Sequence, residues 1–280
     1  MIRKCRFAAM LAFSAMMSTA ALVQAQAADL LSTLNSTHVL TIGTSNDAPL
    51  AYIDPQTKAA VGALPDLLRA ALPLMGVKAD VRAVAMPFSS LIPALQAGRI
   101  DMIGDGIYAT AKRRQVIDFT SNTFYNPEAL DVAKGNPDNL HQLSDLCGHS
   151  AGTYEGTTYV DQLKQASAAC PAGKPIDIHL YPTIQNVFAD LTAGRLNAGV
   201  VDSSLSAYAL KQNPALSFEL VADYKPADKA GSACAFGVTK GNDAFLAGFS
   251  KAYATMLADG TAAKIFTKWG LTPTSFFLSL

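Results

Sequence analysis

The sequence predicts an α/β fold of two lobes, and three observations support this. Short apolar strands alternate with helical patterns along the chain, which is typical of α/β sheets that are largely parallel. One helix–glycine–strand unit occurs once in each half of the chain. The 280 residues, 50% of them hydrophobic and 16% charged, are enough for two packed cores.

In the first half, strands are expected at 38–44, 81–85 and 100–104. Apolar residues from Leu64 to Met75 recur at helical spacing, although Pro73 should kink or end that helix. Ser89 or Ser90 can cap a second helix, which Gly98 stops. Helices therefore connect the expected strands.

In the second half, strands are expected near 150–154 and at 176–180 and 196–201, with helices from Thr158 and Thr183. The C-terminal part is mostly helical. An apolar stripe from Phe245 to Leu257 ends at Gly260, and a short helix follows through Ile265 to Trp269.

The repeated unit is Leu95–Asp101, LQAGRID, matched by Leu191–Asn197, LTAGRLN. In each copy a helix ends on a glycine and leads straight into a buried strand, which should finish with an acid, Asp105 or Asp202. Open α/β sheets bind ligands at the carboxyl ends of their strands. Two such units predict two lobes facing one cleft. The alternative is that the two segments are similar only by convergence, because helices in α/β proteins often end on a glycine before a strand.

The start of the chain has the pattern of a secretory signal peptide at 1–27. Arg3, Lys4 and Arg6 precede an apolar run at 7–23, and Ala25-Gln26-Ala27 offers a cleavage site, with Val23-Gln24-Ala25 as an alternative. A membrane anchor is the competing interpretation. Cleavage takes the basic residues from 22 to 19 against 22 acids, a net charge near −3, and nothing indicates nucleic-acid binding.

Cysteine usage agrees with export to an oxidising compartment. Cys5 lies in the signal peptide, which leaves Cys147, Cys170 and Cys234. Cys147 and Cys170 enclose a helix-sized segment, which favours that pair and leaves Cys234 free and buried. No cysteine follows the apolar run where a lipid anchor would need one, and the four histidines are scattered. We expect a free periplasmic protein with no metal site.

Several residues are candidates for holding a charged ligand. An arginine in the turn after Thr110 can bind a carboxylate through two parallel hydrogen bonds from its planar guanidinium. The alternative is that this basic turn is exposed to solvent and binds nothing. Gly156-Thr157-Thr158 is either an anion site at a helix start or a plain N-cap. Asp202 is either a counter-ion for a ligand ammonium or an N-cap. The aromatic residues Tyr52, Phe88, Tyr108 and Tyr154 could wall the pocket, or lie in the core or rim.

Taken together, these motifs resemble the extracellular solute-binding protein family 3, the receptors of polar amino-acid ABC importers. The resemblance runs from Val39 to Leu271 and is most specific at 88–101, continuing through 110–113 and 117–120. Tyr154–Thr158, the second Ala-Gly-Arg unit with Asp202, 258–261 and Lys268-Trp269-Gly270 complete it.

The resemblance implies a type II periplasmic-binding-protein fold, in which two α/β lobes close on a ligand about two hinge segments. Lobe 1 is expected at 38–126 plus 237–280 and lobe 2 at 130–222, with hinges near 127–130 and 222–236. Cys147 and Cys170 match a disulfide found in one branch of the family.

The resemblance also implies roles for individual residues. Arg113 matches the arginine that grips the ligand α-carboxylate, with Thr157 and the N–H of Thr158 as its partners on the other lobe. Asp202 matches the acid that takes the α-ammonium. The remaining matches are the Gly106 carbonyl, as a second ammonium acceptor, and Phe88, as the aromatic under the ligand side chain.

Some positions depart from the family pattern. Tyr108 stands where a small hydroxyl residue is usual, Asp105 where a small residue or Ser is usual, and Asn197 replaces a common Asp. Compared with the family, the loop 45–49 is one residue short, and Asp47 lies near the place of a stacking aromatic. The extra acids, Asp47 and Asp105, favour a cationic or amine-rich ligand, such as a basic amino acid, an opine-like conjugate or a zwitterionic compatible solute. The alternative is that they form hydrogen bonds to the backbone of a loop.

The expected function is therefore capture of an amino acid or related zwitterion by hinge closure, without catalysis and without a cofactor. The expected partners are the small ligand and an inner-membrane ABC permease, and the protein is expected to be monomeric. One alternative is a cyclohexadienyl-dehydratase-like enzyme with Asp105, Asp47 or Glu155 as general acid. Another is a ligand-sensing partner of a receptor.

Overall fold

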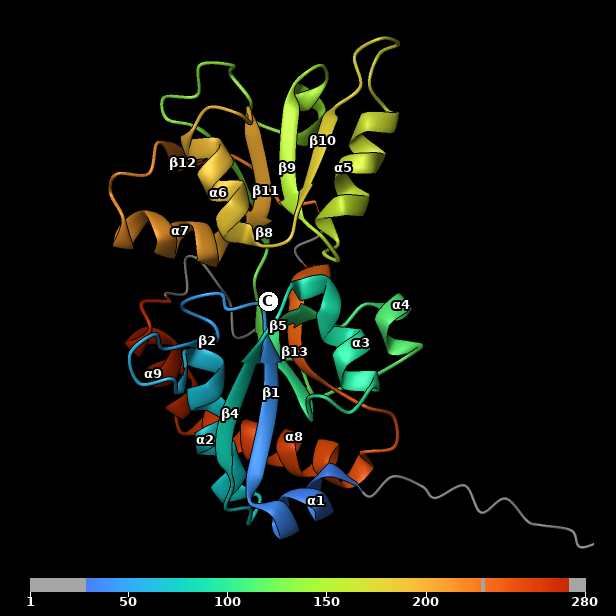
Figure 1. The fold of residues 1–280 in the computed structure, drawn as a ribbon, viewed down its shortest axis with the longest axis vertical. Helices are drawn as coiled ribbons and strands as arrows, with labels where there is room; N and C mark the ends of the chain where they lie inside the picture. Colours follow the sequence, from blue (N-terminus) through green and yellow to red (C-terminus); the bar gives the residue numbers. More distant parts are fainter. Residues whose placement is uncertain (1–28, 228–229, 272–280) are drawn as a thin grey trace, which may run out of the picture.

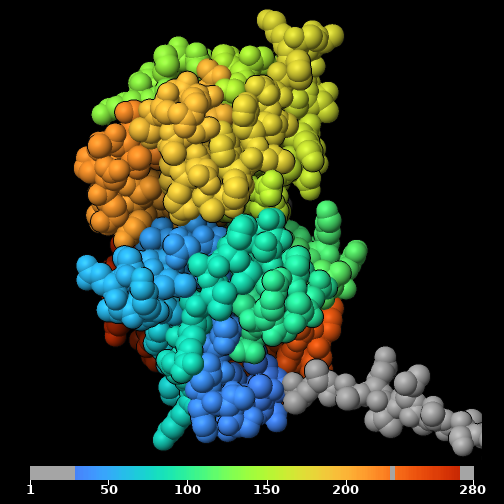
Figure 2. All heavy atoms as spheres, viewed as in Figure 1, coloured from blue at the N-terminus to red at the C-terminus, as the bar shows by residue number. Residues whose placement is uncertain are grey.

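Two α/β lobes, each built on its own sheet, make up the protein (Figure 1). The computed structural model describes residues 29–227 and 230–271. The predicted signal peptide at 1–27 lies outside the described residues. On the face of the molecule drawn in Figure 2, atoms of the two lobes touch where the lobes meet.

Lobe 1 contains a mixed sheet with the strand order β4–β1–β5–β13–β6, and β7 also pairs with β13. Its strands are β1 (Val39–Thr44), β4 (Asp80–Ala85), β5 (Met102–Tyr108), β6 (Asp118–Phe119), β7 (Phe124–Tyr125) and β13 (Ala233–Val238). β1 is parallel to β4 and β5, whereas β13 is antiparallel to β5, β6 and β7. The expectation of largely parallel sheets is therefore only partly right.

Helices cover this sheet, and a two-stranded hairpin lies beside it. The helices are α1 (Leu30–Thr37), α2 (Ala63–Leu74), α3 (Leu91–Gln96), α4 (Ala111–Arg114), α8 (Asp243–Ala258) and α9 (Thr261–Lys268), with β2 (Tyr52–Ile53) and β3 (Ala60–Val61) forming the hairpin. Pro73 lies in the last turn of α2, so that helix ends where the proline predicts. Ser89 and Ser90 do not cap α3 but form a 3₁₀ turn, η1 (Phe88–Ser90), before it.

Lobe 2 contains a sheet with the order β10–β9–β11–β8–β12. Its strands are β8 (Glu128–Ala133), β9 (Ser150–Tyr154), β10 (Asp177–Tyr181), β11 (Ala198–Asp202) and β12 (Phe218–Leu220). Its helices are η2 (Leu143–Leu146), α5 (Tyr159–Ala168), α6 (Ile184–Thr192) and α7 (Ser203–Gln212). The parallel part, β10–β9–β11, is joined to antiparallel β8 and β12.

In both copies of the repeated unit, the helix ends on glycine and leads into a strand, as the sequence predicts. Gly98 follows α3 with φ +66° and Gly194 follows α6 with φ +70°, a left-handed conformation that favours glycine at the end of a helix. The N–H groups of Arg99 and Arg195 then bond to carbonyls of the preceding helices, at Ala94 and Asp190. Each unit therefore turns its chain directly into a central strand, β5 or β11.

The chain crosses between the lobes twice. It leaves lobe 1 between β7 and β8 and returns between β12 and β13 (Figure 1). Glu128, at the start of β8, is 2% exposed and accepts hydrogen bonds from the Ala227 N–H (2.6 Å) and the Tyr224 hydroxyl (3.3 Å). This carboxylate therefore ties the first crossing to the second.

Cys147 and Cys170 form a disulfide in lobe 2, as predicted, and Cys234 is free and buried. The segment between the bonded cysteines holds strand β9 as well as helix α5, so it is larger than the single helix expected. Among the helices formed by residues 29–227 and 230–271, none is both long enough and apolar enough to cross a membrane.

Candidate functional site

A small cavity of about 10 Å³ lies where the two lobes meet. Lobe 1 contributes residues from η1, β5 and α4, and lobe 2 contributes residues from β9, the start of α5 and the end of β11. Its lining consists of Phe88, Gly106, Tyr108, Arg113, Tyr154, Thr157, Thr158, Tyr159 and Asp202. Every site residue predicted from sequence lies here except Asp47, Tyr52 and Asp105.

Arg113 reaches across the cleft from α4. Thr110 caps this short helix by accepting a hydrogen bond from the Arg113 N–H, which fixes the direction of the arginine side chain. One guanidinium nitrogen donates to the Tyr108 carbonyl at 2.8 Å, and the other donates to the Gly156 carbonyl of lobe 2 at 2.9 Å. The guanidinium lies 5.4 Å from the centre of the Phe88 ring. Burial lowers the pKa of Arg113, although the residue as a whole is only half-buried, and its positive charge favours an anionic partner.

Asp202 is the last residue of β11 and is 3% exposed. Its side chain does not cap α7; it accepts hydrogen bonds from the Tyr154 hydroxyl and from Asn126 Nδ2 (2.8 Å). Burial raises the pKa of Asp202 to about 6, and the hydrogen bond from Tyr154 opposes that rise. A cation in the cavity would stabilise the ionised carboxylate.

Thr157 and Thr158 form the start of α5, opposite Arg113. The Thr157 hydroxyl donates to the Tyr154 carbonyl at 2.8 Å and tightens the turn that leads into the helix. Gly156 precedes them with φ +83°, and a Cβ there would lie 2.8 Å from the Cα of Ser89 in lobe 1. Glycine is therefore needed here both for the turn and for the close approach of the lobes.

Tyrosines fill the inner part of the cavity. The hydroxyls of Tyr108 in lobe 1 and Tyr159 in lobe 2 lie 2.7 Å apart, and the Tyr108 hydroxyl also donates to the Asn126 carbonyl. The Tyr154 ring meets the Phe88 ring edge to face, with centroids 5.6 Å apart. Burial raises the pKa values of Tyr108, Tyr154 and Tyr159, so all three stay neutral hydrogen-bonding groups at physiological pH.

Asp47 and Asp105 form a second buried acidic group in lobe 1. The Ser45 hydroxyl bonds to both carboxylates, and the Ser45 N–H donates to Asp105 at 2.6 Å. From lobe 2, Gln185 Nε2 donates to Asp47 at 3.1 Å. Burial, with the charge of Asp105, raises the pKa of Asp47 well above its usual value. Burial also raises the pKa of Asp105, against hydrogen bonds from Ser45.

The prediction that Asp105 ends its strand is wrong. β5 continues to Tyr108, and Asp105 lies inside it. The register between β5 and β13 shifts here, since Ile103 pairs with Gly237 but Ile107 pairs with Ala235. This irregularity breaks the regular pairing around Asp105, whose carboxylate also bonds to the Gly106 N–H at 2.9 Å.

Tyr52 lies apart from the cavity. Its ring packs edge to face against Trp269 with centroids 6.0 Å apart, and it is only partly buried. Trp269 Nε1 in turn donates to Asp66 at 2.9 Å. Tyr52 therefore helps to attach the C-terminal end of α9 to lobe 1.

Sequence reasoning missed three residues of this region: Tyr159, Asn126 and Gln185. Tyr159 follows the predicted Thr157-Thr158 pair directly, so its place at the first turn of α5 was a usable signal. Asn126 joins a crossing segment to Asp202, and Gln185 joins α6 to Asp47 in the other lobe. No local pattern marks these two, because their partners are distant in sequence.

A larger opening adjoins the cavity, and we call it the outer groove. It has a volume of about 720 Å³ and shares Phe88, Arg113, Thr157 and Thr158 with the cavity. Its other lining residues are Ser89, Ile92, Ile107, Thr110, Lys112, Gln115, Val116, Glu155, Gly156, Val160, Asp161 and Leu180. Both lobes therefore line this groove.

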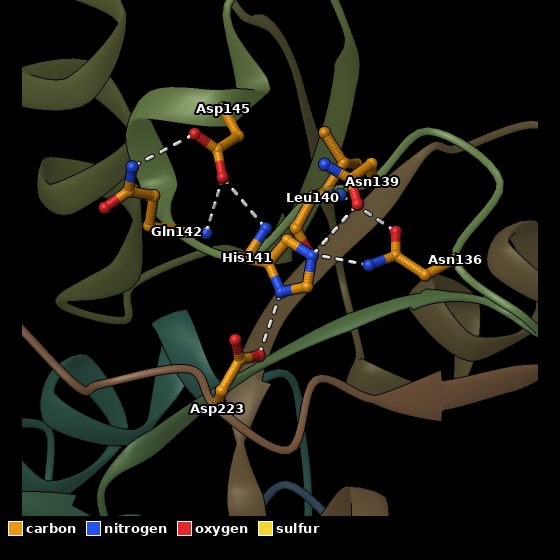
Figure 3. A network of polar contacts seen from close by, with 7 residues as sticks. All are labelled: Asn136, Asn139, Leu140, His141, Gln142, Asp145 and Asp223. Carbon is orange, nitrogen blue, oxygen red and sulfur yellow. Dashed lines mark hydrogen bonds and ion pairs between the residues drawn. The ribbon is translucent and has the colours of Figure 1, made fainter.

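A separate polar network surrounds His141, and none of its members lines the cavity or the outer groove (Figure 3). His141 Nδ1 lies 2.9 Å from Asp223, which raises the pKa of the histidine through that hydrogen bond. The Asp145 carboxylate accepts from the His141 and Gln142 N–H groups. Among the described residues, no three His, Cys, Asp or Glu side chains are grouped so that they could hold a metal ion.

Comparison with known proteins agrees with this architecture. The histidine-binding periplasmic protein of Salmonella typhimurium is 33% identical over 193 residues, which cover 66% of this chain and 70% of that protein. The lysine/arginine/ornithine-binding periplasmic protein of Escherichia coli K12 is 30% identical over 188 residues, with the same coverage. An ancestral arginine-binding protein bound to arginine superposes with a TM-score of 0.73 at 31% identity, covering 83% of this chain and 98% of that one.

The family model described as bacterial extracellular solute-binding proteins, family 3, matches residues 40–272, which include both sheets and every residue of the cavity. With two lobes of the type II periplasmic-binding arrangement and relatives at 30% identity or more, the chain belongs to this family of bacterial extracellular solute-binding proteins.

Proposed function

We propose that this protein is the periplasmic substrate-binding component of an ABC importer and captures an amino acid by closure of its lobes. One observation carries the proposal: Arg113 of lobe 1 and Asp202 of lobe 2 line the same small cavity between the lobes. A guanidinium and a carboxylate at opposite sides of one small space are complementary to the carboxylate and ammonium of a zwitterion. The relatives are named as amino-acid-binding periplasmic proteins, which supports the proposal.

Ligand capture would proceed by exchange of hydrogen bonds. The ligand carboxylate takes the place of the carbonyl oxygens that now accept from Arg113, and the ligand ammonium donates to Asp202. Because each partner comes from a different lobe, both contacts form together only when the lobes are closed. A ligand that binds the closed form better than the open form shifts the population toward closure. The ABC permease would then recognise the closed form.

The side chain of the ligand would carry a further positive charge. Asp47, Asp105 and Asp202 are buried carboxylates; the charge of Asp105 raises the pKa values of the other two, after burial, and Arg113 is the charged cation among the residues lining the cavity. A guanidinium or ammonium group on the ligand would relieve this repulsion by replacing the amide of Gln185 at Asp47. Arginine and ornithine fit this description, and both are named among the ligands of relatives.

Isothermal titration of the purified protein with arginine, ornithine, glutamate and glutamine tests the proposal. We expect the two basic amino acids to bind more tightly than the neutral and acidic ones. Preference for glutamate would contradict the cationic ligand while leaving amino-acid capture standing. No binding of any of these amino acids would contradict the proposed function.

Export, a monomeric state and the absence of catalysis belong to the same proposal. The relatives compared above are binding proteins, which supports this, and capture requires no bond to be made or broken. An assay for phenylpyruvate or phenylalanine formation tests the enzymatic alternative. N-terminal sequencing of the secreted protein should begin at Ala28 if the signal peptide is cleaved after Ala27.

A further inference from the structure

The space available at the cleft lies mainly outside the small cavity, in the outer groove. The outer groove has about 720 Å³, against about 10 Å³ for the cavity. Small-molecule sites span roughly 300–1,000 Å³, whereas roughly 10–15 Å³ accommodates one water. The cavity therefore has room for about one water, while the groove already has the size of a ligand site.

The two spaces are continuous at Arg113. Phe88, Arg113, Thr157 and Thr158 line both, and the guanidinium lies over the Phe88 ring with its nitrogens directed at carbonyls of both lobes. A ligand whose polar middle lies beside Arg113 can therefore occupy the cavity and the groove at once.

The groove beyond Arg113 has a distinct chemistry. Apolar side chains from both lobes line it, Ile92 and Val116 from lobe 1 and Val160 and Leu180 from lobe 2. Val116 is 46% exposed and Leu180 is 44% exposed, so both side chains present apolar surface that a ligand could cover. Lys112 lies on the same wall as Arg113 and supplies a second cation. The groove thus suits an apolar substituent that sits next to a carboxylate.

We propose that the outer groove is a second subsite, so that the cleft takes a zwitterion of dipeptide size with an apolar C-terminal residue. This inference rests on the proposed function and specifies its ligand. The N-terminal ammonium binds at Asp202, the peptide group lies beside Phe88, and the terminal carboxylate binds Arg113 and Lys112. The C-terminal side chain packs on Val116 and Leu180, and contact with both lobes favours closure.

Isothermal titration with L-arginine and with L-arginyl-L-leucine tests this inference. We expect the dipeptide to bind at least about tenfold more tightly, because the leucine side chain becomes buried. Equal or weaker binding of the dipeptide would overturn the second subsite and leave the amino-acid site intact. If neither these two ligands nor the other amino acids bind, the proposed function falls, and the second subsite with it.

A pair of matched variants locates the effect. Leu180→Asp places a charge in the groove at an exposed position, and Leu257→Asp makes the same change at a 42% exposed residue of α8 outside the groove. We expect Leu180→Asp to weaken dipeptide binding about tenfold more than arginine binding. Leu257→Asp should change neither. An equal effect of Leu180→Asp on both ligands, or no effect on either, would overturn the assignment of the groove.

Discussion

The two residues that define the site are already bonded within the protein. Arg113 donates to carbonyls of Tyr108 and Gly156, and Asp202 accepts from Tyr154 and Asn126. Neither charged group is therefore left without polar partners. Under the proposed function a ligand would have to supply equivalent groups, so the site would select for a molecule that carries both charges.

Ligand binding should depend on pH through Asp202. Its pKa of about 6 means that the carboxylate is largely protonated at pH 5, when it no longer attracts an ammonium. We expect the affinity for arginine to fall about tenfold between pH 7 and pH 5. Isothermal titration from pH 8 to pH 5 measures this, with Asp202→Asn as the comparison. An affinity that stays constant across this range in the wild-type protein would contradict the role of Asp202.

Asp131, in β8, should lower the stability of the protein at neutral pH. Its carboxylate is fully buried, one oxygen accepts from Ser206 at 2.6 Å and the other has no partner. Burial raises the pKa of Asp131 to about 7, whereas the pKa of an aspartate in the unfolded chain is about 4. The contribution of this group to the free energy of unfolding is therefore fully present below pH 4 and is lost as the pH rises through 7.

Asp131→Asn should therefore make the free energy of unfolding depend less on pH, and should raise it by about 1–3 kcal/mol above pH 7. Urea denaturation at pH 5, 7 and 8 measures the change. Glu219→Gln, on the neighbouring strand β12, makes the same acid-to-amide change at a partly exposed position and should leave the curve unaltered. A variant curve parallel to that of the wild type would show that Asp131 does not titrate in this range.

Individual site residues were predictable where a local pattern fixes them. Arg113 follows the helix-capping residue Thr110, and Asp202 ends the strand that follows the Gly194-Arg195 turn. Asn126 and Gln185 carry no such signal, because only the fold brings them to Asp202 and Asp47. Sequence alone could therefore name the charges of the site but not all the groups that hold them.

At the scale of elements, the helix–glycine–strand units were the most reliable prediction. Positive φ angles at Gly98 and Gly194 confirm the turns that lead into β5 and β11. The strands β8 and β13 were harder to place, since each pairs antiparallel with partners that are distant in sequence. The irregular pairing that puts Asp105 in the middle of β5 likewise depends on β13 and has no local signature.

The disulfide joins the end of η2 to the segment after α5, across 23 residues. Closing a loop of this length removes conformational freedom from the unfolded chain and should contribute about 3 kcal/mol. We expect the double change Cys147→Ser and Cys170→Ser to lower the free energy of unfolding by this amount. Urea denaturation measures it, and reductant should reproduce the loss in the wild type but not in the variant. Insensitivity of the wild type to reductant would contradict this expectation.

For the whole molecule, closure is limited by how closely the lobes can approach. Gly156 contacts Ser89 across the cleft, and Arg113–Gly156, Tyr108–Tyr159 and Asp47–Gln185 hydrogen bonds also join the lobes. These contacts surround the cavity, so a change in the lobe spacing alters all of them together. Under the proposed function, the ligand and the lobe–lobe contacts would favour the same closed state.

Gly156→Ala should separate the lobes. Its Cβ would lie 2.8 Å from the Ser89 Cα, whereas Gly148→Ala, at nearly the same backbone angle (φ +84° against +83°), meets only the Lys174 side chain at 3.8 Å. Both changes should lower stability by about 1–2 kcal/mol through backbone strain. We expect only Gly156→Ala to weaken ligand binding, as measured by titration. Equal affinities of the two variants would argue against closure at this contact.

The central claim is that Arg113 grips the carboxylate of a zwitterion held between the lobes. Isothermal titration of wild-type protein and Arg113→Ala with arginine and with agmatine, which is arginine without its carboxylate, tests it most directly. Arg114→Ala is the control, because Arg114 packs on Phe119 and does not line the cavity. We predict that Arg113→Ala weakens arginine binding by about 2–5 kcal/mol and leaves agmatine binding unchanged. Equal losses for both ligands, or no loss for arginine, would contradict the account.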